Sequence, residues 1–455
     1  MKIYSTYNDS GILWIPKKPE NWAVCRSKAL FQSQKETNLN NKETNVLSLT
    51  LKGVIRNNKD KPIGLSPSDY STYQIFEKGD LVFKLIDLNN IATSRVGLVP
   101  ERGIMSSAYI RLIPRSADLR TRYFYMQYYS LWLRNIFNNL GAGVRQTINA
   151  NELLNMKIVV PSPSEQDQIV RFLDWKVSSI NKLINIRKNE INKLEELKRS
   201  KILNCVMGQE DDVRSKLSSI SWVKNIPYNW SEETLIQVAE EQKIKNVGLA
   251  ETNLLSLSYG KIIEKDINTT EGLLPFSFEG YQIVYPGNII LRLTDLQNDR
   301  KSLRTGISTT KGIITSAYTC LKVRGNIILP EYLHLQLHSA DLCKVFYGMG
   351  GGVRQSIGFK EIRNLIIAIP PIEEQRRILD VAKQIDNQSN LLIEKYREQI
   401  SALNDLKQRL ISDVVTGQID VRNIEIPEYE YVDEEPESDS DVDRDFDNED
   451  ISEEA

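Results

Sequence analysis

The chain has 455 residues, more than one ordinary domain contains, so two or more hydrophobic cores are expected. Hydrophobic residues make up 41% and charged residues 26%, and the longest purely apolar run, residues 365–369, is too short to span a bilayer. Residues 425–455 carry 16 acidic residues and one basic residue, whereas residues 1–424 carry 57 Lys and Arg against 44 Asp and Glu. This pattern excludes a membrane-spanning protein and favours a basic body that binds a polyanion.

The N-terminal residues and the cysteines indicate the compartment. Residues 1–12 are polar and contain no apolar core of a secretory signal. The four cysteines are scattered and form no CxxC pair. We therefore expect a cytoplasmic protein without a disulfide framework.

Self-similarity dominates the sequence. YQIFEKGDLVFKLIDLNN recurs as YQIVYPGNIILRLTDLQN, and GAGVRQTI recurs as GGGVRQSI. The paired segments, at an offset of 208 and then 209 after one inserted residue, are 45–55 with 253–263, 73–90 with 281–298, 102–112 with 311–321, and 141–148 with 350–357. A nearly constant offset over about 200 residues indicates a tandem duplication.

Each copy begins with a mixed part. Short β-rich runs at 80–86 and 288–293 lie between Gly, Pro and Asn residues and are predicted strands. Residues 120–138 and 330–347 have helical patterns, so this part is α+β. Each mixed part ends in an apolar strand that Pro161 or Pro370 closes.

Each copy continues with a helical part. SPSEQ and PIEEQ place acidic residues in a first helical turn, and a helix of roughly 40 residues is predicted to end at Gly208 or Gly417. Its apolar stripe requires a partner helix, and the simplest arrangement pairs the two copies antiparallel. The predicted domains are 1–162, a helix over 163–210, 211–371, a helix over 372–420, and an acidic disordered tail over 421–455.

This order of motifs, repeated twice, resembles the specificity subunit of type I restriction–modification systems. The resemblance covers about residues 11–420, from the Pro-x-Asn-Trp segment through S-A-Y and G-x-G-V-R-Q to both long helices. It implies that each mixed domain recognises one half of a bipartite site in double-stranded DNA. It also implies that the helices set the spacing and dock two methyltransferase subunits, which two motor/endonuclease subunits then join. S-adenosylmethionine, ATP and magnesium are then expected on those partners, and no cofactor on this chain.

The G-x-G-V-R-Q loops are the sharpest candidate sites. Glycine lets the backbone approach a phosphate closely, and Arg binds a phosphate or a guanine edge. The alternative is a tight turn whose Arg pairs with an internal acid. The candidate residues of the two loops are Gly141, Gly143, Arg145 and Gln146, and Gly350, Gly352, Arg354 and Gln355.

The duplication separates two kinds of DNA contact. Residues shared by both copies cannot distinguish two half-sites, so we assign them to phosphate positioning, scaffold or partner docking. Besides the loop residues, the shared set contains Ser107 and Ser316, Tyr109 and Tyr318, and Lys84 and Arg292. Base-contacting residues are expected where the copies diverge, and the candidates are Arg56, Arg95, Arg300 and Arg304.

Catalytic and metal motifs are weak. His334 and His338 are spaced as a metal pair, but the other copy has Tyr125 and Tyr129 there, so we predict a structural position and no metal. Neither a phosphate-binding G-x-x-x-x-G-K-[ST] loop nor an Asn/Asp-Pro-Pro-Tyr/Phe loop occurs. We therefore predict a recognition subunit rather than an enzyme. A coiled-coil protein adaptor and a stand-alone DNA-modifying enzyme with an unrecognised site remain alternatives.

Overall fold

The computed structural model describes residues 2–51, 53–57, 69–88, 94–140, 146–209, 214–267, 277–296, 303–349 and 356–435. The chain divides into two compact units. Unit 1 contains residues 1–186 and 398–435, and the described part of unit 2 contains residues 187–397. Each unit therefore combines one mixed domain with the first half of one long helix and the last half of the other.

The described part of unit 1 contains twelve short strands. They are β1 Tyr7–Ile12, β2 Ile15–Pro19, β3 Ala23–Arg26, β4 Phe31–Gln32, β5 Leu47–Thr50, β6 Gly53–Arg56, β7 Gln74–Phe76, β8 Leu81–Phe83, β9 Val96–Leu98, β10 Gly103–Met105, β11 Ile110–Pro114 and β12 Lys157–Val160. The helices are α1 Thr121–Leu133, α2 Ile136–Leu140, α3 Ala150–Asn155 and the long α4 Pro163–Val206, which continues into unit 2.

The centre of unit 1 is an antiparallel four-stranded sheet in the order β4-β11-β8-β9. Strand β8 is buried at all three positions, as its continuous apolar sequence requires. Helix α1 packs Tyr123, Phe124 and Tyr128 into the same core, where Phe83 and Tyr128 meet edge to face. The predicted helix at 120–138 is thus found, as α1 and α2.

Unit 2 repeats these elements. Its strands are β13 Ser215–Leu217, β14 Asn225–Pro227, β15 Ser231–Thr234, β16 Ala239–Glu241, β17 Leu254–Ser258, β18 Lys261–Lys265, β19 Gln282–Val284, β20 Ile289–Leu291, β21 Thr305–Ile307, β22 Gly312–Ile314, β23 Thr319–Val323 and β24 Ile366–Ile369. Its helices are α5 Leu235–Val238, α6 Pro330–Leu342, α7 Phe359–Ile362 and the long α8 Ile372–Val415, whose last half lies in unit 1.

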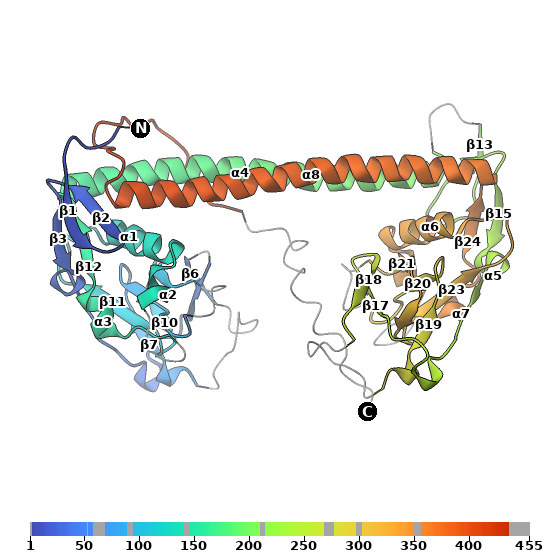
Figure 1. Cartoon of the computed structure of the whole chain (residues 1–455), viewed down its shortest axis with the longest axis horizontal. Coiled ribbons are helices and arrows are strands. Elements are labelled where there is room, and N and C mark those ends of the chain that lie inside the picture. Colours follow the sequence, from blue (N-terminus) through green and yellow to red (C-terminus); the bar gives the residue numbers. More distant parts are fainter. Residues whose placement is uncertain are drawn as a thin grey trace. The chain divides into compact units, whose positions relative to one another are not determined.

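The central sheet of unit 2, β16-β23-β20-β21, corresponds strand for strand to that of unit 1. A second sheet, β18-β17-β22-β19, contains one parallel pair, β17 with β22. Figure 1 shows the same arrangement of helix and sheets within each unit. The duplication predicted from the sequence is therefore a duplication of the fold, and the α+β class is confirmed.

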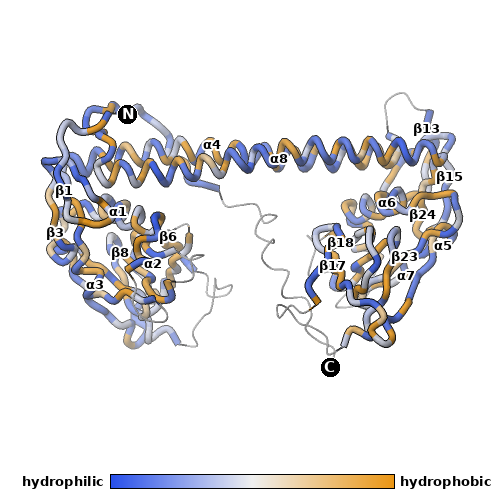
Figure 2. Tube along the Cα trace, in the orientation of Figure 1, coloured by the Kyte–Doolittle hydropathy of each residue, from blue (hydrophilic) through white to orange (hydrophobic). Residues whose placement is uncertain are grey.

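Helices α4 and α8 each have 44 residues and lie at the same place in the two copies. Figure 2 shows hydrophobic residues recurring along both helices between hydrophilic ones. Within unit 2, Lys198 of α4 contacts Asp386 of α8, whereas Cys205 contacts the carbonyl of Ile378. The partner number falls as the α4 number rises, so the two helices pair antiparallel, as predicted.

Each mixed domain is anchored on the end of a long helix. In unit 1 the Tyr123 hydroxyl donates to the Val415 carbonyl, and in unit 2 the Tyr332 hydroxyl donates to the Val206 carbonyl, both at 3.0 Å. Gly417 follows α8 with a φ of +76°, and a Cβ there would collide with Pro19 and Trp22. Only glycine accommodates both the left-handed backbone and this close approach.

Residues 421–435, here called the strap, run back along α4 within unit 1 (Figure 1). Val421 is fully buried, and Gln168 of α4 donates to the carbonyls of Val421 and Ile424 at 3.0 and 2.8 Å. Disorder predicted from residue 421 onward is therefore wrong for the strap, because side chains of α4 satisfy its backbone. The rest of the predicted tail, residues 436–455, lies outside the described residues.

Within the described ranges, no helix is both long enough and apolar enough to cross a membrane. Cys25, Cys205, Cys320 and Cys343 are all free thiols.

Candidate nucleic-acid interface

The G-x-G-V-R-Q-T-I motif ends against one edge of the central sheet of unit 1. The amide of Leu88 donates to the Gln146 carbonyl at 3.2 Å, and the amide of Ile148 donates to the Leu85 carbonyl at 3.0 Å. Unit 2 repeats this contact, because the Ile357 amide donates to the Leu293 carbonyl at 2.9 Å. The described end of the motif therefore contacts the loop that follows β8 in unit 1 and β20 in unit 2.

Backbone strain gathers at this junction. Asp87 and Asp295, at equivalent positions, have φ of 52° and 54°, and Gln146 has φ of 43°. Non-glycine residues in this region cost about 1–3 kcal/mol each, and such residues cluster at functional sites. Both copies therefore hold an unfavourable backbone at this loop edge, which comprises residues 85–88 in unit 1 and 293–296 in unit 2.

Arg95 and Arg304 hold this edge from inside. Arg95 is 1% exposed, and its guanidinium donates to the carbonyls of Ile86 and Asp87 at 3.1 and 3.0 Å. Arg304 is 0% exposed and donates to the carbonyls of Thr294 and Asp295 at 2.7 and 3.4 Å. Burial lowers the pKa of Arg95. The prediction that these two arginines contact bases is corrected: they occupy equivalent positions and position the strained loop.

Arg56, unlike Arg95 and Arg304, lies on the surface. It ends β6, is exposed, and forms an ion pair with Glu101, which raises the Arg56 pKa. The equivalent position in unit 2 is Glu264, which β18 exposes in the same way. A cation in one copy therefore faces solvent where the other copy presents an anion, which is the divergence expected of a base-contacting position.

The remaining predicted DNA contacts are only partly described. Lys84 and Arg292 are half-buried beside the loop edge, where the Lys84 amide donates to the Arg95 carbonyl and the Arg292 amide to the Arg304 carbonyl. Gln146 is half-buried and supports the loop through its carbonyl. The predicted residues outside the described part of the chain are Gly141, Gly143, Arg145, Arg300, Gly350, Gly352, Arg354 and Gln355.

The shared S-A-Y segment is a turn on the scaffold. Ser107 and Ser316 are exposed, and the Ser316 hydroxyl donates to the Gly280 carbonyl. Tyr109 and Tyr318 pack against small apolar clusters behind the turn, and burial raises the pKa of Tyr109. Gln74 and Gln282 hold the same turn through the carbonyls of Tyr109 and Tyr318, both at 2.6 Å. These contacts support the scaffold assignment among the alternatives.

His334 and His338 lie on α6 with ring centroids 5.9 Å apart. Burial lowers the pKa of both to about 4, so both are neutral at pH 7. His338 Nδ1 bonds the Thr305 hydroxyl at 3.0 Å. Among the described residues, no group of three or more His, Cys, Asp or Glu is arranged to hold a metal ion.

A buried ion pair that was not predicted from the sequence lies inside unit 1. Arg111 of β11 donates to Asp80 at 2.6 Å, with side-chain exposures of 6% and 4%. Burial outweighs the arginine and raises the pKa of Asp80 to about 6. The sequence does contain a sign of this ion pair, because Arg111 interrupts the otherwise apolar strand sequence YIRLI and would need a buried acidic partner.

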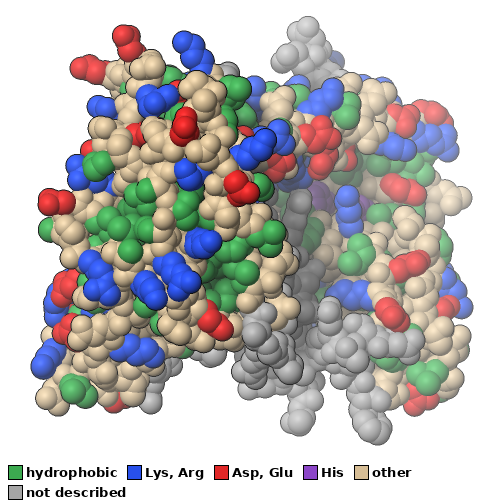
Figure 3. All heavy atoms as spheres, turned by 60° about the vertical axis from the view of Figure 1, so that its left-hand side comes forward, with side chains coloured by type: hydrophobic (Ala, Val, Ile, Leu, Met, Phe, Trp, Pro, Cys, Tyr) green, Lys and Arg blue, Asp and Glu red, His purple; other side chains and the backbone are tan. Residues whose placement is uncertain are grey.

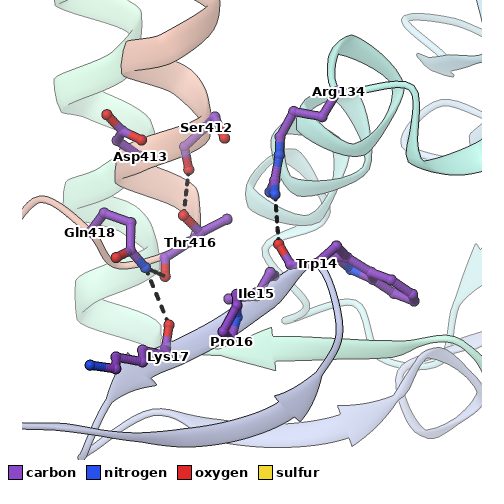
Figure 4. Close-up of a pocket in the computed structure, with 9 residues that line it drawn as sticks. All are labelled: Trp14, Ile15, Pro16, Lys17, Arg134, Ser412, Asp413, Thr416 and Gln418. Atoms are coloured by element: carbon purple, nitrogen blue, oxygen red, sulfur yellow. Dashed lines mark hydrogen bonds between the residues drawn. The ribbon is translucent and has the colours of Figure 1, made fainter.

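Figure 3 shows Lys and Arg side chains gathered beside a hydrophobic patch on the forward face of unit 1. A separate cleft of about 410 Å³ lies where α8 ends against β2 (Figure 4). There Arg134 donates to the Trp14 carbonyl and Gln418 to the Lys17 carbonyl, at 2.7 and 3.2 Å. Since its polar groups hold the helix end to the domain, this cleft belongs to the anchoring contacts.

Comparison with known proteins identifies the family to which this fold belongs. The family model described as the Type I restriction modification DNA specificity domain matches residues 19–196 and 306–402, more than half of the chain. The chain belongs to this family. The predicted function class, DNA sequence specificity in a type I restriction–modification system, is thereby confirmed.

Individual relatives agree. The Type I restriction enzyme MjaVIII specificity subunit of Methanocaldococcus jannaschii is 25% identical over 353 residues, which are 71% of this chain and 76% of that protein. The putative MjaX specificity subunit of the same organism is 26% identical over 316 residues, 65% of this chain and 68% of that protein. A chain in a solved structure on the assembly and conformational transition of the type I R-M system shares the fold at 15% identity, with a TM-score of 0.60 over 88% of this chain and 99% of that chain.

Proposed function

We propose that this specificity subunit binds double-stranded DNA at a bipartite target, one half for each mixed domain. The proposed recognition domains are residues 1–162 and 211–371, joined by the helices over 163–210 and 372–420. The observation that carries the proposal is the pattern of likeness and difference between them. Contacts such as Tyr123 with Val415 recur in the second copy, whereas the exposed charge reverses from Arg56 to Glu264.

Roles of the candidate residues follow from this pattern. We assign Arg145, Arg354, Gln146 and Gln355, with Lys84 and Arg292, to positioning on the phosphate backbone, since both copies carry them. Arg56 and Arg300 remain the proposed base contacts. Arg95 and Arg304 act through the loop edge that they hold.

The long helices are the proposed spacer and partner-docking surface. A 44-residue helix is about 66 Å long, more than the ~34 Å between successive major grooves on one side of DNA. The proposed complex contains two methyltransferase and two motor/endonuclease subunits and works in the cytoplasm. Methyl transfer and cleavage, with S-adenosylmethionine, ATP and magnesium, then belong to those partners, and this subunit is not an enzyme.

A domain exchange tests independent recognition. Residues 1–162 are replaced by the equivalent domain of a relative, and the methylated motif of the host is sequenced. One half of the target should change while the other half and the gap stay the same. Simultaneous change of both halves would exclude two independent recognition domains.

An insertion tests the spacer. Four residues placed directly before Gly208 add about one helical turn, roughly 6 Å, and keep the apolar stripe nearly in phase. The unspecified gap should lengthen by about one or two base pairs at ~3.4 Å per pair. An unaltered gap would show that the helices do not set the spacing.

A further inference from the structure

The strap is held by a row of polar side chains on α4. The Ser178 hydroxyl donates to the Glu430 carbonyl at 3.1 Å and accepts from the Val432 amide at 2.8 Å. One turn later, the Asn181 amide donates to the Val432 carbonyl at 3.1 Å. These bonds engage the backbone of an extended segment and place no demand on its side chains.

The row continues at Asn185, which donates to the Asp433 carbonyl and accepts from the Glu435 amide, both at 2.9 Å. Over residues 430–435 of the strap, the Glu434 carboxylate is held by charge. Lys407 of α8 binds this carboxylate at 2.5 Å and lies 3.4 Å from the Asn181 amide oxygen. This part of the strap is therefore held through its extended backbone and through the acid at position 434.

Unit 2 contains the same cation and amide. Lys198 and Asn390 are the equivalents of Lys407 and Asn181, and Lys198 donates to the Asn390 amide oxygen at 2.9 Å. In place of a strap acid, Lys198 pairs with Asp386 of α8 at 2.5 Å. The equivalent of Asp386 in α4 is Val177. Asp386 thus occupies the electrostatic position that Glu434 fills in unit 1.

The strap-binding face of α4 in unit 1 and the equivalent face of α8 in unit 2 differ in solvent exposure. Ser178, Asn181 and Asn185 are 2%, 5% and 6% exposed beneath the strap. Their equivalents Asn387 and Glu394 are exposed, and Asn387 offers both a donor and an acceptor where Ser178 does. After α4 the chain enters β13, whereas after α8 it turns back as the strap. Unit 2 therefore carries the equivalent side chains with Asn387 exposed and Asn390 half-buried, and the Asn390 amide donates to Asp386 at 2.9 Å.

We propose that the face of unit 2 formed by Lys198, Asp386, Asn387 and Asn390 binds an extended, acid-bearing segment of a partner polypeptide. The segment lies along α8 as the strap lies along α4, with its backbone bonded to Asn387 and Asn390. Its carboxylate takes Lys198 from Asp386. The inference depends on the internal repeat and on the seated strap, and holds whatever DNA sequence the subunit recognises.

The test uses a fluorescent peptide of residues 424–435, titrated into the full chain and followed by anisotropy. Saturable binding of one peptide per chain is expected. Lys198→Ala should weaken it about tenfold or more, since a charge-assisted contact is lost. Asn390→Ala should weaken it as well, since a hydrogen bond to the peptide backbone is lost. Asp386→Asn should strengthen binding, because it removes the internal competitor. Lys201→Ala, an exposed lysine on the same helix, is the matched control and should change nothing.

Several results overturn the proposal. The first is the absence of saturable binding, and the second is equal binding by Lys198→Ala and the control. The third is binding that is sensitive to Lys407→Ala but not to Lys198→Ala, which would place the peptide in unit 1. Tighter peptide binding after truncation at residue 435 would show that the chain's own end occupies the face instead of a partner. Unchanged melting temperatures of the variants exclude misfolding, and the Asp386→Asn gain cannot arise from it.

Discussion

The two units are built on one frame but have different interiors. Gln127 and Gln336 bond the last strand of each domain in the same way, through Val159 and Ala368. At the centre of the sheet, however, unit 1 buries Asp80 with Arg111, where unit 2 has Asn288 and Cys320. The anchors that join domain to helix are kept, while the chemistry inside each domain is free to change. Divergence of the recognition surface therefore does not require divergence of the joints.

The largest expected effect comes from breaking the ion pair that only unit 1 has. Asp80→Asn leaves the Arg111 guanidinium, 6% exposed, beside the half-exposed Glu36 alone at 3.6 Å, and should cost about 3–5 kcal/mol of unfolding free energy. Asp80→Asn with Arg111→Cys reproduces the pair of unit 2 and should recover most of this loss. Urea unfolding of the three proteins measures it. A double variant as unstable as the single one would mean that the two interiors are not interchangeable.

A joint that both units share should respond equally in both. Gly208→Ala and Gly417→Ala each place a Cβ against a proline and a tryptophan at positive φ, and should each cost about 2–3 kcal/mol. Gly325→Ala, with φ +67° and open space around it, isolates the backbone strain and should cost about 1 kcal/mol. Thermal unfolding compares the three. A large difference between the first two variants would contradict equivalent joints.

Low pH should destabilise unit 2 more than unit 1, because the two buried histidines lie in unit 2. Burial first, then mutual repulsion for His334 and the cations Arg199 and Lys198 for His338, lower both pKa values to about 4. Because the folded pKa lies below the unfolded value of 6.5, stability is present above pH 6.5 and is lost as the pH falls towards 4. Unit 2 should lose about 2 kcal/mol or more at pH 5. His334→Tyr with His338→Tyr, copying Tyr125 and Tyr129, should remove this acid dependence in pH-dependent unfolding.

The smallest effects concern DNA. Arg145→Ala and Arg354→Ala should each weaken binding by about 1 kcal/mol on every sequence and reduce the log–log salt slope by about one. Arg56→Ala should instead relax base choice in one half-site only. Salt titrations and methylome sequencing with the partner subunits present distinguish the two outcomes. New base preferences in Arg145→Ala with an unaltered slope would reverse the assignment.

The repeat, the α+β class and the long helices were predictable because they are properties of periodicity and spacing, which a sequence displays directly. The roles of Arg95 and Arg304 could not be predicted from the sequence. The segments around them differ between the two copies, and only the folded loop shows that both arginines bind the carbonyls at the same turn. The strap was missed for a related reason. Its composition is acidic and polar, but its order comes from side chains of α4 about 250 residues away, which composition does not reveal.

The anchoring of Tyr123 on Val415 has a consequence for the order of folding. The described residues of unit 2 all fall within 187–397, and this part of unit 2 can assemble as soon as that stretch leaves the ribosome. Unit 1 needs residues 398–435 to cover its helix and to receive the Tyr123 hydroxyl, a contact separated by 292 positions. The domain synthesised first is therefore the one completed last. Until then its apolar helix face is exposed, and chaperone binding is expected to concentrate there.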